Sequence, residues 1–133
     1  MRLELADLLR KLEKFDEAEA ILLEGTDHST REFGDLYEEA NCYYRLCQMK
    51  ATRGNKDEAL QLLAHAKGAV DQLLKAGNNE QETEIKNLAA DIHATIADLA
   101  SQGSDFDNAI KFYAKAASLA RVQLVFVQPI THI

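Results

Sequence analysis

A four-residue segment recurs three times along this chain, as FDEA at residues 15–18, KDEA at 56–59 and FDNA at 106–109. Each copy begins a predicted helix, and the helix before it carries small and large apolar residues at matching offsets. Such self-similarity is typical of helical hairpins repeated along a chain, and not of one closed domain around a catalytic pocket. The repeat therefore predicts a binding surface without saying what is bound.

Composition and charge narrow the class of partner. The chain of 133 residues is 47% hydrophobic, has a single proline, and carries a net charge of −7. Few helix breakers and an abundance of Ala, Leu, Glu and Lys favour helices. An acidic surface disfavours nucleic acid and anionic lipid, because both are polyanions that bind through basic residues. We therefore expect protein partners, with no nucleic acid and no membrane.

The N-terminal residues and the cysteines indicate an intracellular protein, expected in the cytoplasm. Charges interrupt the apolar residues after Met1, so no signal-peptide core is present, and no apolar run approaches the ~20 residues that a membrane span requires. Cys42 and Cys47 lie five positions apart on one predicted helix, a poor arrangement for a disulfide. The helix that starts at Met1 without a capping residue suggests a fragment of a longer protein.

Apolar periodicity and turn residues predict six helices. The second is expected to end at Gly25, and the third to begin at a capping box formed by Ser29 and Glu32. Gly54 separates the third helix from the fourth. The predicted helices start near Met1 and cover about 16–24, 32–53, 55–74, 80–102 and 105–121.

The last twelve residues differ in character from the rest. Residues 122–133 are apolar and prone to β structure, and Pro129 cannot donate a backbone hydrogen bond. Three interpretations stay open: a strand, a docking segment, or an effect of where the chain was cut. As a docking or self-association tail, the segment would act through Val125, Phe126 and Val127.

These features resemble tetratricopeptide repeats over about residues 2–120. That family pairs a helix A with a helix B, and small residues lie where the two helices cross. The matching positions are Leu5, Ala6, Leu9, Phe15, Ala18 and Leu22 in the first repeat; Tyr43, Leu46, Cys47, Gly54, Ala59, Leu63 and Ala66 in the second; and Ile96, Ala97, Ala100, Phe106, Ala109, Tyr113 and Ala116 in the third.

The chain also departs from the family's usual pattern. The helix-B alanines Ala18, Ala59 and Ala109 are separated by 41 and 50 residues, against roughly 34 in the common repeat. Glu13 stands where Gly is usual and Lys56 where an aromatic residue is usual. These departures fit the long helices of divergent repeats in large intracellular scaffolds, which include axonemal and transport-complex proteins. The resemblance therefore implies a cytoskeletal or axonemal assembly as a further expected location.

The resemblance implies an all-α, tetratricopeptide-like α-solenoid. We expect about three antiparallel hairpins (six helices), stacked right-handedly. The repeat domain would cover residues 1–121, in repeats of about 2–25, 31–76 and 80–121, followed by the apolar tail at 122–133.

The resemblance also implies a peptide-binding groove on the concave side, formed by helix A of each repeat. The aligned positions are Asp7, Arg10, Lys11, Asn41, Tyr44, Gln48, Asp91, Asp98 and Gln102. The alternative is that these side chains are only the solvated faces of helices.

One subfamily uses such positions to clamp a carboxylate with basic side chains. Here the equivalent positions hold Leu3, Asp7, Arg45, Asp91 and Thr95, so Arg45 alone is basic. We therefore expect a basic or apolar partner segment and no carboxylate clamp.

Nothing in the sequence indicates catalysis, a metal or a cofactor. The four histidines form no HExxH motif and the two cysteines no CxxC motif, which argues against zinc. His93 is expected in the core, and Cys47 at a small-residue packing position. An enzyme would instead need a nucleophile assembled from Cys42, Cys47 and His93.

The sequence therefore predicts a non-enzymatic interaction scaffold, binding partner segments in the groove or stacking in a larger assembly with self-association. The alternative is a regulatory module in which a bound peptide or ligand changes the curvature of the repeats.

Overall fold

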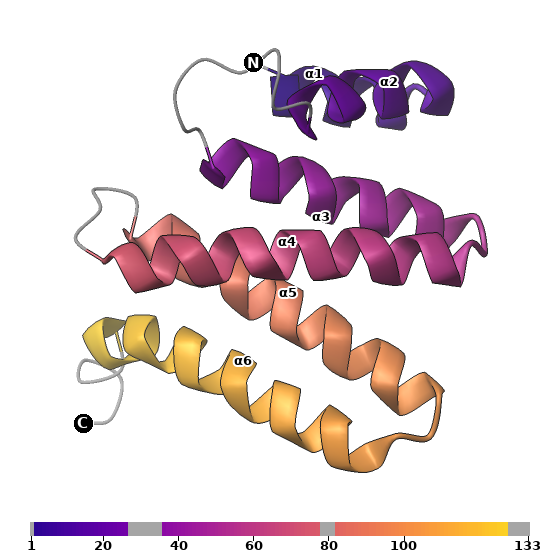
Figure 1. The fold of residues 1–133 in the computed structure, drawn as a ribbon. Coiled ribbons are helices and arrows are strands. Elements are labelled where there is room, and N and C mark those ends of the chain that lie inside the picture. The colour runs from indigo at the N-terminus through magenta and orange to yellow at the C-terminus, as the bar shows by residue number, and fades with distance from the viewer. Residues whose placement is uncertain (1, 27–35, 78–81, 128–133) are drawn as a thin grey trace. The chain divides into compact units, whose positions relative to one another are not determined.

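The structure is a computed structural model that describes residues 2–26, 36–77 and 82–127, with side chains as far as Leu119. Every regular element in these ranges is a helix (Figure 1). The helices are α1 (Arg2–Lys11), α2 (Phe15–Thr26), α3 (Leu36–Thr52), α4 (Lys56–Ala76), α5 (Glu82–Gln102) and α6 (Phe106–Val127). The predicted all-α fold of six helices is confirmed.

The chain divides into two compact units, Met1–Val70 and Asp71–Ile133. Helix α4 begins in the first unit and ends in the second. In the first unit, α1 and α2 form one antiparallel hairpin, and α3 continues into α4 through a short turn; in the second, α5 and α6 form a hairpin (Figure 1). The limits of the three predicted repeats stay predictions.

Within each hairpin the turn has the same backbone geometry. In the first turn the N–H of Glu13 donates to Arg10 and the N–H of Lys14 to Leu9, at 3.0 and 2.8 Å. This pair of bonds is a Schellman motif, which requires a left-handed residue at its centre. Equivalent bonds recur in the other two turns, from Gly54 to Ala51 and Asn55 to Lys50, and from Ser104 to Ser101 and Asp105 to Ala100.

The central residue of each turn has a positive φ: 63° at Glu13, 86° at Gly54 and 63° at Ser104. The sequence marks only Gly54 as suited to that conformation. The predicted break between residues 102 and 105 contains Gly103 and Ser104, and the left-handed position is the serine. The recurrence of the turn supports the repeat at the level of the backbone, even though its residues differ.

The residue after each left-handed position is the N-cap of the next helix. The carbonyls of Lys14, Asn55 and Asp105 accept from the N–H groups of Ala18, Ala59 and Ala109, each at 3.0 Å. The end of one helix is therefore joined to the N-cap of the next without a linker residue. These turns place each helix-B alanine one turn into its helix, where it is buried.

The first unit has a core shared by three helices. Its buried members are Ala6 of α1, Ala18 and Leu22 of α2, and Cys42, Leu46 and Met49 of α3. The small side chains among them, Ala6 and Ala18, let the helix backbones approach one another. Of the positions matched to the repeat, Ala6, Ala18, Leu22 and Leu46 are confirmed as buried in this core.

Gly25 shows how closely α2 approaches α3. It lies inside α2, which continues to Thr26, so the expectation that Gly25 ends this helix is wrong. A Cβ atom placed on Gly25 would lie 2.3 Å from the Cys42 Sγ and 3.0 Å from Cδ of Arg2. Glycine is required here by the close contact of two helices and not by a turn.

The second unit is a long hairpin with an uneven division of burial. Helix α5 buries Ile85, Leu88, Ala89, Ile92, His93 and Ala97. Among the described side chains of α6, Ala109 is the buried one, whereas Phe106 and Ile110 are 60% and 68% exposed. Much of the apolar surface of α6 is therefore left open in this unit.

The chain from Val122 to Val127 is helical, because α6 runs six residues beyond the predicted end. A strand over these residues is therefore wrong: the alternation of large apolar residues also suits a helix, and helix propagation from a long α6 decides between the two. Residues 128–133 lie outside the described part of the chain, as does the predicted capping box at Ser29 and Glu32.

Candidate functional site

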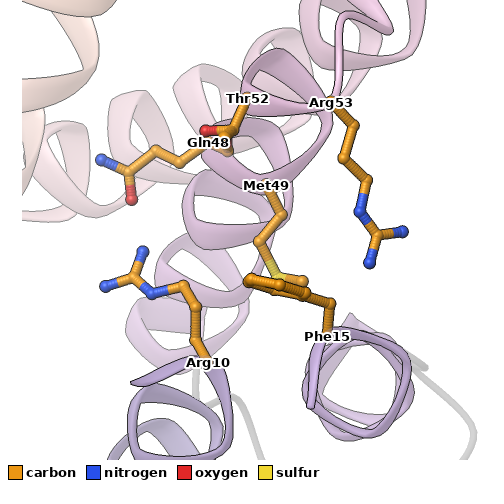
Figure 2. A pocket seen from close by; sticks show the side chains of 6 residues that line it. All are labelled: Arg10, Phe15, Gln48, Met49, Thr52 and Arg53. Carbon is orange, nitrogen blue, oxygen red and sulfur yellow. The ribbon is translucent and has the colours of Figure 1, made fainter. Parts of the chain in front are cut away.

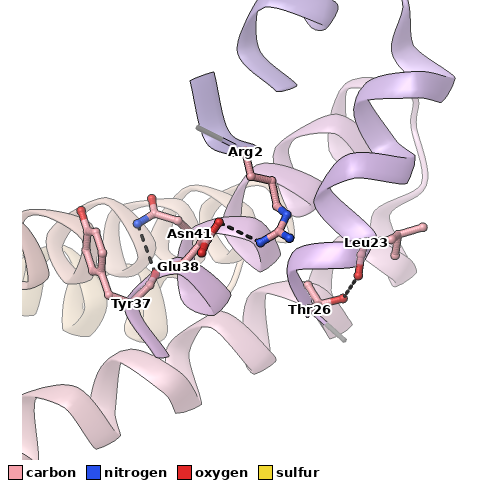
Figure 3. A network of polar contacts seen from close by, with 6 residues as sticks. All are labelled: Arg2, Leu23, Thr26, Tyr37, Glu38 and Asn41. Carbon is pink, nitrogen blue, oxygen red and sulfur yellow. Dashed lines mark hydrogen bonds and ion pairs between the residues drawn. The ribbon is translucent and has the colours of Figure 1, made fainter. Parts of the chain in front are cut away.

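Helices α1 and α3 of the first unit are joined by ion pairs along the face on which the resemblance places the groove. The Arg45 guanidinium donates to the Asp7 carboxylate, and Arg10 Nη2 lies 3.9 Å from the same carboxylate. At the other end of α1, Arg2 donates to Glu38 at 2.9 Å (Figure 3). Arg45, aligned with a position of the carboxylate clamp, is therefore engaged within the protein.

A pocket of about 160 Å³ opens where the end of α1, the start of α2 and the end of α3 converge. Its walls are Arg10, Phe15, Gln48, Met49, Thr52 and Arg53 (Figure 2). Phe15 and Met49 form its apolar part, and polar side chains surround them. None of the lining residues is acidic.

Both arginines at the pocket hold loose contacts with carboxylates of the chain. Arg53 lies 3.7 Å from Asp16 and 3.6 Å from Glu19, and its guanidinium carbon is 5.5 Å from the centre of the Phe15 ring. A strong charge-assisted hydrogen bond is shorter, at about 2.7–2.9 Å. In Figure 2, Arg10 and Arg53 lie on opposite sides of the Phe15 ring.

A larger, shallower groove of about 500 Å³ lies between α2, α3 and α4 within the first unit. Its residues include Leu23, Leu62 and a stacked pair, Tyr43 and His65, whose ring centres are 5.0 Å apart. Lys50 lies at its edge, 2.6 Å from Glu19 and 3.2 Å from Glu58. The groove therefore carries both signs of charge in contact with each other.

Of the predicted groove residues in the first unit, the structure brings Arg10 and Gln48 together at the pocket. Lys11 is exposed at the end of α1, and Tyr44 is half-buried. Asn41 is buried, and its Nδ2 donates to the Tyr37 carbonyl at 3.3 Å (Figure 3), so it faces the interior.

The remaining predicted residues lie in the second unit on α5. Partial burial raises the pKa of Asp91, and Asp98 accepts a hydrogen bond from the Tyr113 hydroxyl. That hydrogen bond raises the pKa of Tyr113, because only the protonated phenol can donate it to the Asp98 carboxylate. Gln102 is exposed at the end of the helix. Whether any of these residues binds a partner stays a prediction.

Sequence reasoning missed four residues of the pocket: Phe15, Met49, Thr52 and Arg53. Phe15 was matched to the first repeat as a packing position, and Met49 is a buried member of the core of the first unit. Met49 and Thr52 are three positions apart on α3, and Arg53 follows directly after that helix, so their spacing does place them close together. The convergence of three helix ends upon them is a tertiary feature that this spacing does not reveal.

The residues considered for catalysis lie in structural positions. Burial raises the pKa of the Cys47 thiol to about 11, so the nucleophilic thiolate is scarce at neutral pH. His93 is 4% exposed, and its Nδ1 lies 2.7 Å from the Ala89 carbonyl, to which it donates. The ring also stacks on Phe112, with centres 5.8 Å apart. The prediction that His93 belongs to the core is confirmed.

Metal sites and membrane-spanning helices can be considered for the described part of the chain. Within it, no three His, Cys, Asp or Glu side chains gather as a metal site requires. None of its helices has the combination of length and apolar character needed to cross a membrane.

Comparison with known proteins identifies the family to which this chain belongs. A family model described as "Tetratricopeptide repeat protein 21 forth ARM domain" matches residues 1–117. The chain belongs to the tetratricopeptide repeat protein 21 family. The predicted resemblance to a helical repeat is thereby confirmed, and the 41-residue interval from Ala18 to Ala59 falls in the roughly 40–47-residue range of armadillo-type repeats.

Two relatives in this family are similar to the chain. Human tetratricopeptide repeat protein 21B is 32% identical over 117 residues, which cover 85% of this chain and 9% of the relative. Mouse tetratricopeptide repeat protein 21A is 27% identical over 135 residues, which cover 98% of this chain and 10% of the relative. The chain thus spans about a tenth of the length of these curated relatives.

Proposed function

We propose that this chain is a non-enzymatic interaction module that binds a segment of another protein at the face formed by α1 and α3. The observation that supports this most directly is the pocket at the convergence of α1, α2 and α3, where Phe15 and Met49 lie beneath polar side chains. Apolar pockets with a few convergent polar groups are the usual form of a recognition site. Membership of a helical repeat family is consistent with a scaffold role.

The pocket is preformed by the fold, which favours binding. Thr52 is held through a hydrogen bond from its hydroxyl to the Gln48 carbonyl at 2.8 Å, and Met49 is 6% exposed and packed in the core of the unit. A surface whose backbone is already fixed by helices loses little conformational entropy on binding. Partner segments can therefore be held without a change in the hairpins.

Site-specific photo-crosslinking in cells tests this proposal. A photoreactive phenylalanine analogue placed at Thr52 should crosslink a second protein, and the same analogue at the exposed Ala64 of α4 serves as the control. The proposal is supported by a heterologous adduct from position 52 that is absent from position 64. Equal adducts from both positions, or none from position 52, would contradict it.

Exposed apolar rows support a second part of the proposal, association with further hairpins. On α1 and the residue that follows it, Leu5, Leu8 and Leu12 are 47%, 53% and 58% exposed. On α6, a similar row is formed by Phe106, Ile110 and Tyr113, at 60%, 68% and 43%. Each row has the spacing of one helix face, and contiguous apolar surface of this kind marks an interface.

Light scattering measures this association. The double variant Phe106→Glu/Ile110→Glu should remain monomeric at concentrations where the unchanged chain self-associates, because charge on the row opposes its burial. Identical masses for both proteins across the concentration range would rule out the row on α6 as a contact between copies.

A further inference from the structure

We propose that the pocket lined by Phe15 and Met49 accepts one apolar side chain of a partner segment whose neighbouring residues are acidic. This inference deepens the proposed function and rests on it, since it names the chemistry of the segment that the module binds. Its basis is the joint placement of an apolar pocket and two arginines at its rim.

The size and lining of the pocket suit a single side chain. About 160 Å³ corresponds to the share of liquid volume of roughly five water molecules, at about 30 Å³ each. That is room for one Leu, Met or Phe side chain, and not for a folded element. Phe15 is 40% exposed, so its ring is available to cover an incoming apolar group.

The charge around the pocket selects acidic neighbours. Arg10 and Arg53 approach the carboxylates of Asp7, Asp16 and Glu19 no closer than 3.6 Å. Each guanidinium has five N–H donors, and it forms its strongest bonds with a carboxylate in a paired, planar geometry. The loose intramolecular contacts leave donors for such bonds with a partner's Asp or Glu.

The charge of the pocket differs from that of the whole chain. A net charge of −7 favours basic partners over the surface as a whole. At the pocket, however, a basic segment would bring Lys or Arg against Arg10 and Arg53. The lining holds no acidic residue, and the carboxylates beside it already face these two arginines. A nucleic acid would meet two arginines locally but the repulsion of an acidic chain beyond them. An acidic and apolar peptide satisfies both parts of the site.

Fluorescence polarisation with three labelled peptides tests the inference. The first peptide has a central Leu with two Glu on each side, the second replaces this Leu by Ser, and the third replaces each Glu by Lys. The first should bind the full chain at least about tenfold more tightly than either of the others, and its affinity should fall as salt is raised, because exposed charges are screened.

Two variants and a control connect this binding to the pocket. Arg10→Gln/Arg53→Gln should weaken binding of the first peptide about tenfold, and Arg10→Gln alone should weaken it by a smaller factor. Lys56→Gln/Lys75→Gln removes the same charge from exposed positions outside the pocket and should leave affinity within about twofold. Circular dichroism confirms that each variant is folded, and the single variant guards against loss of the Arg53 contacts with α2.

Each outcome decides the question. No binding of the first peptide at about 1 mM, equal binding of the Lys peptide, or equal losses in the variant and the control would overturn the inference. If crosslinks from position 52 persist in that case, the interaction module stands and only the acidic, apolar chemistry fails. Loss of both the crosslinks and the peptide binding would remove the proposed function together with the inference.

Discussion

The first unit, Met1–Val70, and the second, Asp71–Ile133, use the same hairpin turn but bury their helices differently. In the first unit, buried residues of α1, α2 and α3 meet in a single cluster around Leu22 and Leu46. In the second, α6 keeps Phe106, Ile110 and Tyr113 exposed. The comparison teaches that the turn specifies a hairpin, whereas the neighbours of that hairpin decide how much apolar surface it buries.

The ion pairs differ in the same direction, although in the second unit the Tyr113 hydroxyl of α6 also donates to Asp98 of α5. In the first unit Arg45, Arg2 and Lys50 each pair with a carboxylate on another helix. In the second, the ion pair of Lys86 with Glu82, at 3.1 Å, joins successive turns of one helix. Cross-helix pairs fix the position of one helix against another, and pairs within a helix do not.

Truncation of a buried side chain should give the largest difference in unfolding free energy between the two units. Leu46→Ala removes a side chain that is 1% exposed and should lower the free energy of unfolding by about 2–5 kcal/mol. Ile110→Ala, on a row that is open to solvent, should change it by less than about 0.5 kcal/mol. Chemical denaturation followed by circular dichroism measures both; similar losses would show that α6 is covered in solution.

Gly25→Ala probes the close approach of α2 and α3. The new Cβ would meet the Cys42 Sγ, so we expect a loss of about 1–3 kcal/mol from overpacking. Gly68→Ala lies inside α4 with nothing within 4 Å of the added carbon, and should stabilise the chain by up to about 1 kcal/mol. Adding Cys42→Ala to Gly25→Ala should restore part of the loss, and simple additivity of the two changes would contradict the contact.

Replacement of Lys50 sharpens the electrostatic part of the comparison. Lys50→Met should cost up to about 1 kcal/mol, because Lys50 bridges two carboxylates, and Lys86→Met only about 0.3–0.5 kcal/mol. Bonds to Glu19, and then to Glu58, raise the pKa of Lys50 above its ordinary value of 10.5. The contribution is therefore complete at neutral pH and is lost as pH rises through that raised pKa.

Thermal unfolding of both lysine variants at neutral pH, at low and high salt, provides the measurement. The difference between them should shrink at high salt, since these side chains are partly exposed. Equal costs at both salt concentrations would mean that the cross-helix pair is no stronger than the local one.

The turns should give the smallest effect, and the same one in both units. Glu13→Gly and Ser104→Gly each place glycine at a φ of 63° and should gain about 0.5 kcal/mol, because the strain of a side chain there exceeds the entropy that glycine costs. Gly54→Ala should have the opposite sign. Unequal gains at positions 13 and 104, measured as shifts in the melting temperature, would show that the turns contribute to the difference between the units.

The repeated helix starts could be predicted from the sequence, whereas the convergence of helix ends at the pocket could not. The spacing of Ala18, Ala59 and Ala109 indicated three helix starts, because a small residue at a helix crossing is a local requirement with a fixed offset. The positions of the turns follow from the predicted helix limits, but Glu13 and Ser104 did not reveal their left-handed conformation, since neither residue type signals a positive φ. At residues 122–127 the apolar pattern suited both strand and helix, and continuation of α6 settled the matter.

The candidate site shows the same limit. Arg10 and Gln48 were found by alignment to a groove, but the other walls of the pocket come from three helix ends whose meeting depends on tertiary packing. Asn41, aligned to the same groove, is buried, and its side chain donates to the carbonyl of Tyr37 on the same helix. Alignment to a repeat identifies a helix face, and only the packing of neighbouring helices shows which side chains on that face are accessible.

In each turn the left-handed residue is followed directly by the N-cap of the next helix. Insertions into these turns should therefore be tolerated less well than substitutions. Glu, Gly and Ser all occupy the central position, so the turn tolerates changes of residue. One added residue would instead rotate the following helix by about 100° about its axis, since a helix has 3.6 residues per turn. That rotation would carry Ala18, Ala59 or Ala109 away from its crossing, so these turns should vary in composition across related chains while keeping their length.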